Sequence, residues 1–248
     1  MQYVDGYDSA SVPPTAMSPE RAAQIVVQTA AALDYAHARG VLHRDVKPAN
    51  LLLSRSAGVG AGFDERVLLT DFGIAKLLDD TGHLTRTGNL TATLAFASPE
   101  QLTNAALDHH CDQYALACTL FRLLTGIGPY DAPRVGAVVF GHLHAPIPSP
   151  RIYRPDLPAE LDAVLERAMA KEPSERFDSC GAFADEARRA LRGRSGGVSR
   201  HSKVDVPSGL CLSPTSGINA RTPNRRSPSP IRGGRSPTRM RKEGPRRP

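Results

Sequence analysis

The chain has 248 residues, 40% of them hydrophobic, which is enough to bury one sizeable core. Its net charge of +6 comes from one end, because residues 193–248 hold 13 Lys or Arg against two acidic residues, whereas residues 1–192 hold 18 against 23. The four cysteines form no CxxC pair and no metal-ligand spacing with the histidines, so we expect no zinc site and no disulfide framework. The sequence has no run of about 18 apolar residues, so we expect no signal peptide and no membrane span.

The first predicted element is an amphipathic helix over residues 18–40. Ser18 is a typical N-cap, Pro19 fits the first turn, and Glu20 suits the positive end of the helix dipole. Small and apolar residues then recur at helical spacing until Gly40, a typical helix stop. The recurring residues are Ala22, Ile25, Val26, Thr29, Leu33 and Ala36.

A loop with the sequence HRDVKPAN follows at residues 43–50, and its residue types suit phosphoryl transfer. Asp45 can orient an attacking hydroxyl and accept its proton, while Lys47 can neutralise charge on the phosphoryl group that is transferred. Asn50, five residues after Asp45, offers an amide oxygen to a magnesium ion. We therefore interpret Asp45 and Lys47 as catalytic and Asn50 as a metal ligand.

Three short apolar pieces predict small strands on a mostly helical body. They are Val41–Leu42, Leu51–Leu53 and Val67–Leu69. The sequence DFG at residues 71–73 comes almost directly after the last of them, which places the Asp71 carboxylate at a strand end. Asp71 and Asn50 make a candidate metal pair, because Mg²⁺ favours a few protein oxygens and otherwise takes phosphate and water.

A polar, threonine-rich segment separates Gly73 from the sequence SPE at residues 98–100. Polar character is what a segment needs if it is to be phosphorylated and then reordered. A phosphate on Thr85 or Thr87 would add nearly two negative charges beside Arg44. We interpret these two threonines as regulatory phosphorylation sites.

Helices dominate the next part of the chain, and we expect them over residues 108–125, 133–144, 158–171 and 179–192.

Residues 193–248 contain no aromatic residue, and 25 of these 56 residues are Gly, Pro or Ser. Such a segment cannot bury enough apolar surface to offset the entropy of ordering it. We expect it to be a disordered basic tail.

The motifs HRDVKPAN, DFG and SPE occur in this order and are followed by a helical pattern. In this respect the chain resembles the bacterial eukaryotic-like serine/threonine protein kinases, most of all those of actinobacterial type, over residues 1–192. The resemblance implies an α+β, mainly α fold, with short strands near the catalytic loop. It assigns residues 1–192 to the hinge and C-terminal lobe of a protein kinase domain, with the disordered tail at 193–248 and the N-terminal lobe absent.

The resemblance also assigns roles within the expected reaction, transfer of the ATP γ-phosphoryl group to Ser or Thr hydroxyls. It makes Asp45 the catalytic base and Lys47 a phosphate contact. It makes Asn50 and Asp71 ligands of Mg²⁺, with Mn²⁺ as an alternative. Thr93 aligns with the substrate-loop threonine that contacts the Asp and Lys of the catalytic loop. The implied partners are protein substrates and another kinase molecule for trans-phosphorylation.

The first six residues resemble the hinge between the two kinase lobes, where backbone groups near Gln2 and Val4 would meet adenine. Leu52 would touch adenine from below. Residues 1–248 contain no counterpart of the glycine-rich phosphate loop, the VAIK-type Lys, or the helix Glu that pairs with it. Because this catalysis is mostly positioning and charge stabilisation, we expect negligible kinase activity from these residues alone.

Three structural contacts follow from the same resemblance. Glu100 should pair with Arg176, and Asp112 should cap the backbone of the HRD loop. His43 should pack with Phe72 in the lower half of the family's hydrophobic spine. These contacts would hold the site in shape.

Two alternative functions, of other classes than a kinase, remain open. A catalytically silent lobe could bind a partner kinase or a substrate as a scaffold, and the basic tail could bind nucleic acid, although it has no aromatic residue for base stacking. The intact set of Asp45, Lys47, Asn50 and Asp71 favours the kinase, and nucleic-acid binding is disfavoured. We expect a cytoplasmic location, leaving open a membrane anchor in a longer form.

Overall fold

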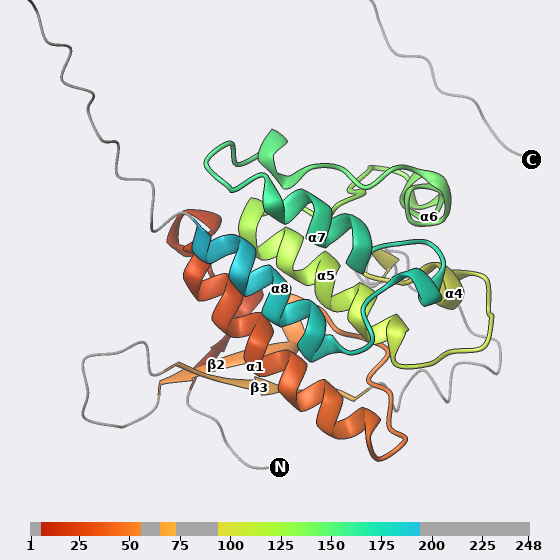
Figure 1. Ribbon diagram of the computed structural model, residues 1–248, viewed down its shortest axis with the longest axis horizontal. Coiled ribbons are helices and arrows are strands. Elements are labelled where there is room, and N and C mark those ends of the chain that lie inside the picture. Colours follow the sequence, from red (N-terminus) through yellow and green to blue (C-terminus); the bar gives the residue numbers. More distant parts are fainter. Residues whose placement is uncertain (1–5, 56–64, 73–93, 194–248) are drawn as a thin grey trace, which may run out of the picture. The chain divides into compact units, whose positions relative to one another are not determined.

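A computed structural model describes residues 6–55, 65–72 and 94–193 (Figure 1). The described part is mainly helical, with one small sheet, as the sequence predicts. Its helices are α1 (Pro19–His37), α4 (Pro99–Leu102), α5 (His110–Thr125), α6 (Val135–His144), α7 (Glu160–Ala168) and α8 (Cys180–Arg192). Its strands are β1 (Gly6–Asp8), β2 (Leu51–Arg55) and β3 (Glu65–Leu69). The predicted tail lies almost wholly outside the described residues.

Helix α1 begins where the sequence predicts. The Ser18 hydroxyl accepts a hydrogen bond from the Arg21 backbone N–H at 3.1 Å, and Pro19 occupies the first position, where a missing N–H costs nothing. The helix ends at His37, and Gly40 then adopts a positive φ of 73°. That conformation lets the chain reverse into the loop of residues 43–50.

The core is built around α5, which is buried along nearly its whole length. Helix α8 lies between α1 and α7, and α5 packs against all three (Figure 1). Gly126, in a left-handed conformation with φ of 83°, ends α5 as predicted. The largest core side chains on α5 are Tyr114, Leu116, Leu120, Phe121 and Leu124.

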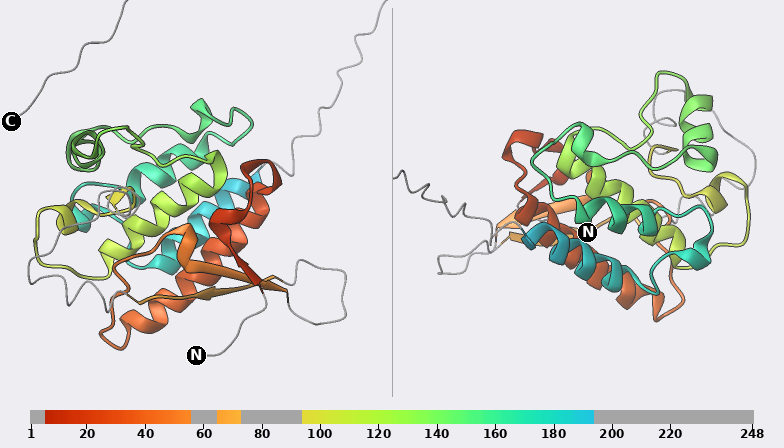
Figure 2. Two further views of the ribbon diagram at one scale, coloured as in Figure 1. Left: turned by 180° about the vertical axis from the view of Figure 1, so that it is seen from behind. Right: turned by 45° about the horizontal axis from the view of Figure 1, so that its top comes forward.

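The sheet is antiparallel in the order β1-β2-β3 and lies against the side of α1 that is remote from α7 (Figure 2). Leu51 and Leu53 of β2 are buried in the core, so the alternation of the strand turns Leu52, which is only half-buried, to the other face. Leu52 lies opposite Leu68 in the register. The sheet thereby positions Asn50 and Asp71, which flank its ends.

Two predicted elements need correction. Val41–Leu42 is not a strand, because the Val41 N–H bonds back to the Ala36 carbonyl at 3.1 Å and closes the end of α1. The helix expected over 158–171 is only Glu160–Ala168. The helix ends there because the Ala170 N–H bonds to the carbonyl of Arg167, three residues back, at 3.2 Å, which tightens the turn.

Candidate active site

The HRD loop is fixed to the helical core by one buried carboxylate. Oδ2 of Asp112, on α5, accepts the backbone N–H of His43 at 2.8 Å, and Oδ1 accepts that of Arg44 at 2.7 Å. Arg44 has a positive φ of 64°, a conformation that costs energy outside glycine and persists only where surrounding contacts hold it. The predicted capping role of Asp112 is confirmed.

Asp45, Lys47 and Asn50 come together on this loop. Nζ of Lys47 lies 2.7 Å from Oδ2 of Asp45, and about a fifth of each side chain is exposed. Nδ2 of Asn50 donates to the Asp45 backbone carbonyl at 2.8 Å and to Oδ2 at 3.2 Å. The carboxylate is therefore held by an ammonium and an amide while it stays open to solvent.

Asp71 leaves the sheet beside Asn50. The N–H of Thr70, the residue before Asp71, donates to the Asn50 carbonyl at 3.0 Å, which extends the β2–β3 pairing by one step. Asp71 is exposed and has a positive φ of 56°. This backbone pairing brings the predicted metal ligands from the two strand ends to the same edge of the sheet.

The oxygens at this edge suit a magnesium ion. Both hydrogen bonds of the Asn50 amide use its nitrogen, and among the described residues none is recorded to its Oδ1. The Asp71 side chain is exposed. One amide oxygen and one carboxylate are the hard donors that Mg²⁺ takes from proteins, with phosphate and water completing its octahedron.

The predicted packing of His43 with Phe72 is confirmed, with ring centroids 4.7 Å apart. Nε2 of His43 also lies 2.8 Å from the Thr70 carbonyl. His43 is fully buried, so it connects the catalytic loop to the segment that carries Asp71. This contact fixes the relative position of the two motifs.

The predicted ion pair of Glu100 with Arg176 is also confirmed. The guanidinium contacts both carboxylate oxygens, at 2.7 and 2.9 Å, and both residues are buried. Arg176 further donates to the backbone carbonyls of Ala170, His110 and Lys171. The pair therefore ties the start of α4 to the α7–α8 connection and to α5.

Sequence reasoning missed one contact of the loop. Nε2 of Gln101 donates to the Arg44 carbonyl at 2.9 Å, while Oε1 of the same side chain accepts the Ser98 N–H at 3.0 Å. The spacing of Ser98 and Gln101 is that of a capping box, which could have singled out Gln101. Helix α4 thus supports the catalytic loop directly.

The buried Cys111 thiol, 3.9 Å from Oδ1 of Asp112, is not set up as a nucleophile. Burial, and then the Asp112 carboxylate, raise the pKa of the Cys111 thiol far above its ordinary value. The thiol stays protonated at neutral pH. Five predicted site residues, Gln2, Val4, Thr85, Thr87 and Thr93, lie outside the described residues.

Across the described ranges, none of the helices combines the length and apolar character that a bilayer crossing requires.

Comparison with known protein families gives a match to the protein kinase domain. The family's sequence model matches residues 1–186 of this chain.

Two mycobacterial kinases and one solved kinase domain are similar to this chain. Serine/threonine-protein kinase PknJ of Mycobacterium tuberculosis is 52% identical over 196 residues, which cover 78% of this chain and 32% of PknJ. PknH of the same species is 43% identical over 193 residues, covering 77% of this chain and 29% of PknH. The crystal structure of the M. tuberculosis PknI kinase domain superposes with a TM-score of 0.54 at 35% identity, covering 77% of this chain and 64% of that domain. The chain spans about a third of the length of these curated relatives.

Proposed function

Because this chain belongs to the protein kinase family, whose members typically use ATP and Mg²⁺, we propose that it carries the catalytic loop of a serine/threonine kinase. The reaction is transfer of the ATP γ-phosphoryl group to a Ser or Thr hydroxyl of a protein substrate. Asp45, Lys47, Asn50 and Asp71 are the residues that we assign to it.

One observation carries the proposal: Asp45, Lys47 and Asn50 meet within hydrogen-bonding distance on a loop whose backbone is anchored by a buried carboxylate. Phosphoryl transfer needs little covalent chemistry from the protein and depends on positioning and charge. A rigid loop that presents a carboxylate, an ammonium and an amide meets that need.

Each side chain has a distinct task. The Asp45 carboxylate orients the substrate hydroxyl and accepts its proton, for which its exposed edge leaves room. Lys47 moves from Asp45 to the phosphoryl oxygens and neutralises part of their charge. Asn50 keeps its amide nitrogen on Asp45, so Oδ1 remains for the metal, together with the Asp71 carboxylate. A Mg²⁺ ion held by Asn50 and Asp71 would supply positive charge to offset the negative charge that develops on the phosphate oxygens.

Regulation by phosphorylation belongs to the same proposal. Another kinase molecule would phosphorylate Thr85 or Thr87, and the phosphate would pair with Arg44 next to the catalytic Asp45. Thr93 would contact the Asp45 and Lys47 pair in the ordered loop. Gln2, Val4 and Leu52 would line the adenine site.

We assign no kinase activity to residues 1–248 on their own. Their sequence has no counterpart of the glycine-rich loop or of the phosphate-binding Lys, and these groups clamp the ATP phosphates in the family. Their loss should cost several orders of magnitude in rate. The intact Asp45, Lys47, Asn50 and Asp71 set favours this account over that of a silent scaffold, which needs none of the four.

The test is a phosphotransfer assay with labelled ATP and a protein substrate, run on the longest natural protein that contains these residues. Asp45→Asn should lower kcat by about 10²–10⁴. Asp131→Asn, an exposed carboxylate on another loop, should leave kcat within about twofold of the unchanged protein. Equal rates for the unchanged protein and Asp45→Asn would refute the assignment. Turnover by residues 1–248 alone that disappears in Asp45→Asn would refute the inactivity.

A further inference from the structure

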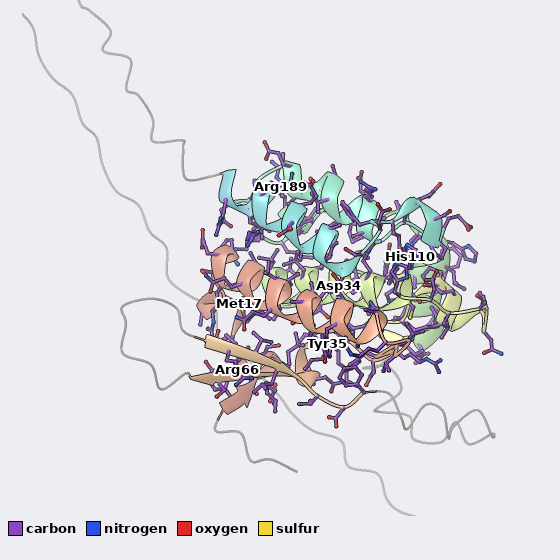
Figure 3. All side chains as sticks on the ribbon, turned by 60° about the horizontal axis from the view of Figure 1, so that its bottom comes forward. Met17, Asp34, Tyr35, Arg66, His110 and Arg189 are labelled. Atoms are coloured by element: carbon purple, nitrogen blue, oxygen red, sulfur yellow. The ribbon has the colours of Figure 1, made fainter. Side chains whose placement is uncertain are left out.

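Outside the catalytic loop, three potential metal ligands from distant parts of the chain meet between α1 and α8. They are Asp34 and His37 on α1 and Cys180, the first residue of α8. One carboxylate oxygen, one imidazole nitrogen and the sulfur all lie within 4.8 Å of one another. Asp34 lies between the ribbons of α1 and α8 in Figure 3. Linear spacing could not reveal this group, because 143 residues separate His37 from Cys180.

The orientation of His37 points to a bound ion. Its Nε2 lies 2.8 Å from Oδ2 of the fully buried Asp112, which accepts a hydrogen bond from that nitrogen. Nδ1 is buried without a hydrogen-bond partner. The side chain is 10% exposed, and Nδ1 faces the Asp34 carboxylate at 4.0 Å. A buried nitrogen without a partner costs free energy, and a cation between Nδ1 and the Asp34 carboxylate would supply that partner.

We propose that Asp34, His37 and Cys180 bind a zinc-like divalent transition-metal ion, with water in the fourth position. Oxygen, nitrogen and sulfur donors of these types bind Zn²⁺ tetrahedrally at about 2.0–2.3 Å. Tetrahedral bonds of that length place donor atoms about 3.3–3.8 Å apart, so the three groups need to close by only about an ångström. Asp112 supplies the carboxylate that commonly orients a metal-binding histidine through its other nitrogen.

The Asp34 carboxylate lies beside Cys180, whose backbone N–H it accepts at 3.0 Å, so a cation at this place would lie next to negative charge. Metal binding replaces the S–H bond with a metal–sulfur bond and releases the proton to solvent. The resulting thiolate lies at the N-terminus of α8, where the helix dipole favours negative charge.

The site has an access route and retains free lone pairs. The Asp34 side chain is 35% exposed, so an ion can arrive along it. The Asp34 oxygens already accept the backbone N–H groups of Cys180 at 3.0 Å and Gly181 at 2.9 Å. Each carboxylate oxygen has a second lone pair for the metal. An ion here would join α1 to α8 and, through His37 and Asp112, to the catalytic loop.

The test is a titration of the reduced, metal-free 248-residue chain with Co²⁺, which reports thiolate binding by a sulfur-to-cobalt charge-transfer band. We expect one equivalent to bind with this band, Zn²⁺ to displace it, and Zn²⁺ to raise the melting temperature. Cys180→Ser should abolish the band and the Zn²⁺-dependent rise. His37→Gln should weaken binding by at least about tenfold.

Matched controls separate this site from other ligands. Cys118→Ser alters a buried cysteine outside the group, Cys211→Ser alters the cysteine beyond residue 193, and His110→Asn alters the second acid–histidine cluster, at residues 108–110. All three should keep the band. Absence of the band in the unchanged chain, its persistence in Cys180→Ser, or its loss in Cys211→Ser would overturn the proposal.

If circular dichroism shows that Cys180→Ser does not fold, Asp34→Asn takes its place. The Asn side chain can still accept a backbone N–H, but it binds the ion more weakly. An unchanged Co²⁺ affinity in both Asp34→Asn and His37→Gln would overturn the proposal. Because Co²⁺ binding is read without any phosphotransfer, failure of this site and failure of the kinase assignment give different results.

Discussion

At the catalytic loop, a single buried carboxylate holds the backbone that carries Asp45. Asp112 accepts the N–H groups of His43 and Arg44 and also contacts Nε2 of His37. Hydrogen bonds to a charged acceptor are stronger than neutral ones, and they compensate for burying the charge. The strained backbone at Arg44 depends on them.

Asp112→Asn should therefore destabilise the fold and loosen the loop. The amide retains one acceptor and presents an NH₂ group where an acceptor is needed. We expect the free energy of unfolding in urea to fall by about 2–4 kcal/mol. Asp185→Asn, which alters an exposed i,i+3 pair with Arg188, should cost no more than about 0.5 kcal/mol. Similar losses for the two variants would contradict the account.

Arg176 offers a second test at this scale. Its planar guanidinium binds both Glu100 oxygens and three carbonyls, a pattern that a lysine ammonium cannot reproduce. Arg176→Lys should lower the free energy of unfolding by about 2–4 kcal/mol. Arg188→Lys, at the exposed pair with Asp185, serves as control and should change it by less than about 0.5 kcal/mol. A tolerated Arg176→Lys would show that the bidentate geometry is unimportant.

These residues also show how far the sequence could predict the site. Asp45, Lys47 and Asn50 are neighbours in sequence, so their convergence follows from the spacing of one motif. The partners Glu100 with Arg176 and Asp112 with the HRD loop could be predicted only through the family resemblance. The Asp34, His37 and Cys180 group escaped prediction, because it depends on how α8 packs on α1.

Among the secondary-structure elements, α6 is hydrogen bonded to α5 through a titratable group. Nδ1 of His142 is hydrogen bonded to the Tyr114 hydroxyl at 3.0 Å, and His142 is fully buried. Burial, and then the nearby Lys171 ammonium, lower the pKa of His142 to about 4 from the ordinary 6.5. The histidine is therefore neutral in the folded protein at any pH above about 4.

This lowered pKa predicts a pH-dependent stability. Between pH 6.5 and 4 the unfolded chain takes up a proton at His142 that the folded chain excludes, so stability falls as pH falls. From pH 7 to pH 5 this group alone should remove about 2 kcal/mol from the free energy of unfolding. The measurement is urea unfolding at both pH values. The free energy of unfolding of His142→Gln should fall by about 2 kcal/mol less between pH 7 and pH 5 than that of the unchanged chain.

Tyr114→Phe is the matched control, because it removes the hydrogen bond but keeps the buried histidine. It should lower stability by about 1 kcal/mol at both pH values and retain the full loss between them. An identical pH dependence in His142→Gln and the unchanged chain would contradict the lowered pKa.

The helices were predictable where caps mark their ends. Ser18 caps α1 as the sequence predicts, α5 ends at Thr125 as predicted, and residue 179, the predicted start of α8, is its N-cap. The end of α7 was not predicted, because the last turn tightens: the Ala170 N–H bonds to the Arg167 carbonyl, three residues back. Element ends of this kind are set by local geometry that propensity patterns do not contain.

On the scale of the whole molecule, the described residues supply one side of the proposed phosphotransfer site. The catalytic loop, the Asp71 segment and α4 are held together by contacts to α5 and to the α7–α8 connection. The phosphate-clamping groups of the family have no counterpart in residues 1–248. The central claim is that this half-site becomes a serine/threonine kinase when those groups are supplied.

The most direct measurement adds these phosphate-clamping groups to the chain and tests for activity. A lobe carrying a glycine-rich loop and the phosphate-binding Lys, taken from a mycobacterial serine/threonine kinase, is joined in frame ahead of Met1, and transfer of labelled γ-phosphate to Ser or Thr is measured. The account predicts transfer by this fusion, a loss of about 10²–10⁴ in rate with Asp45→Asn, and no transfer by residues 1–248 alone. A folded fusion that transfers phosphate no faster than its Asp45→Asn variant would contradict the claim.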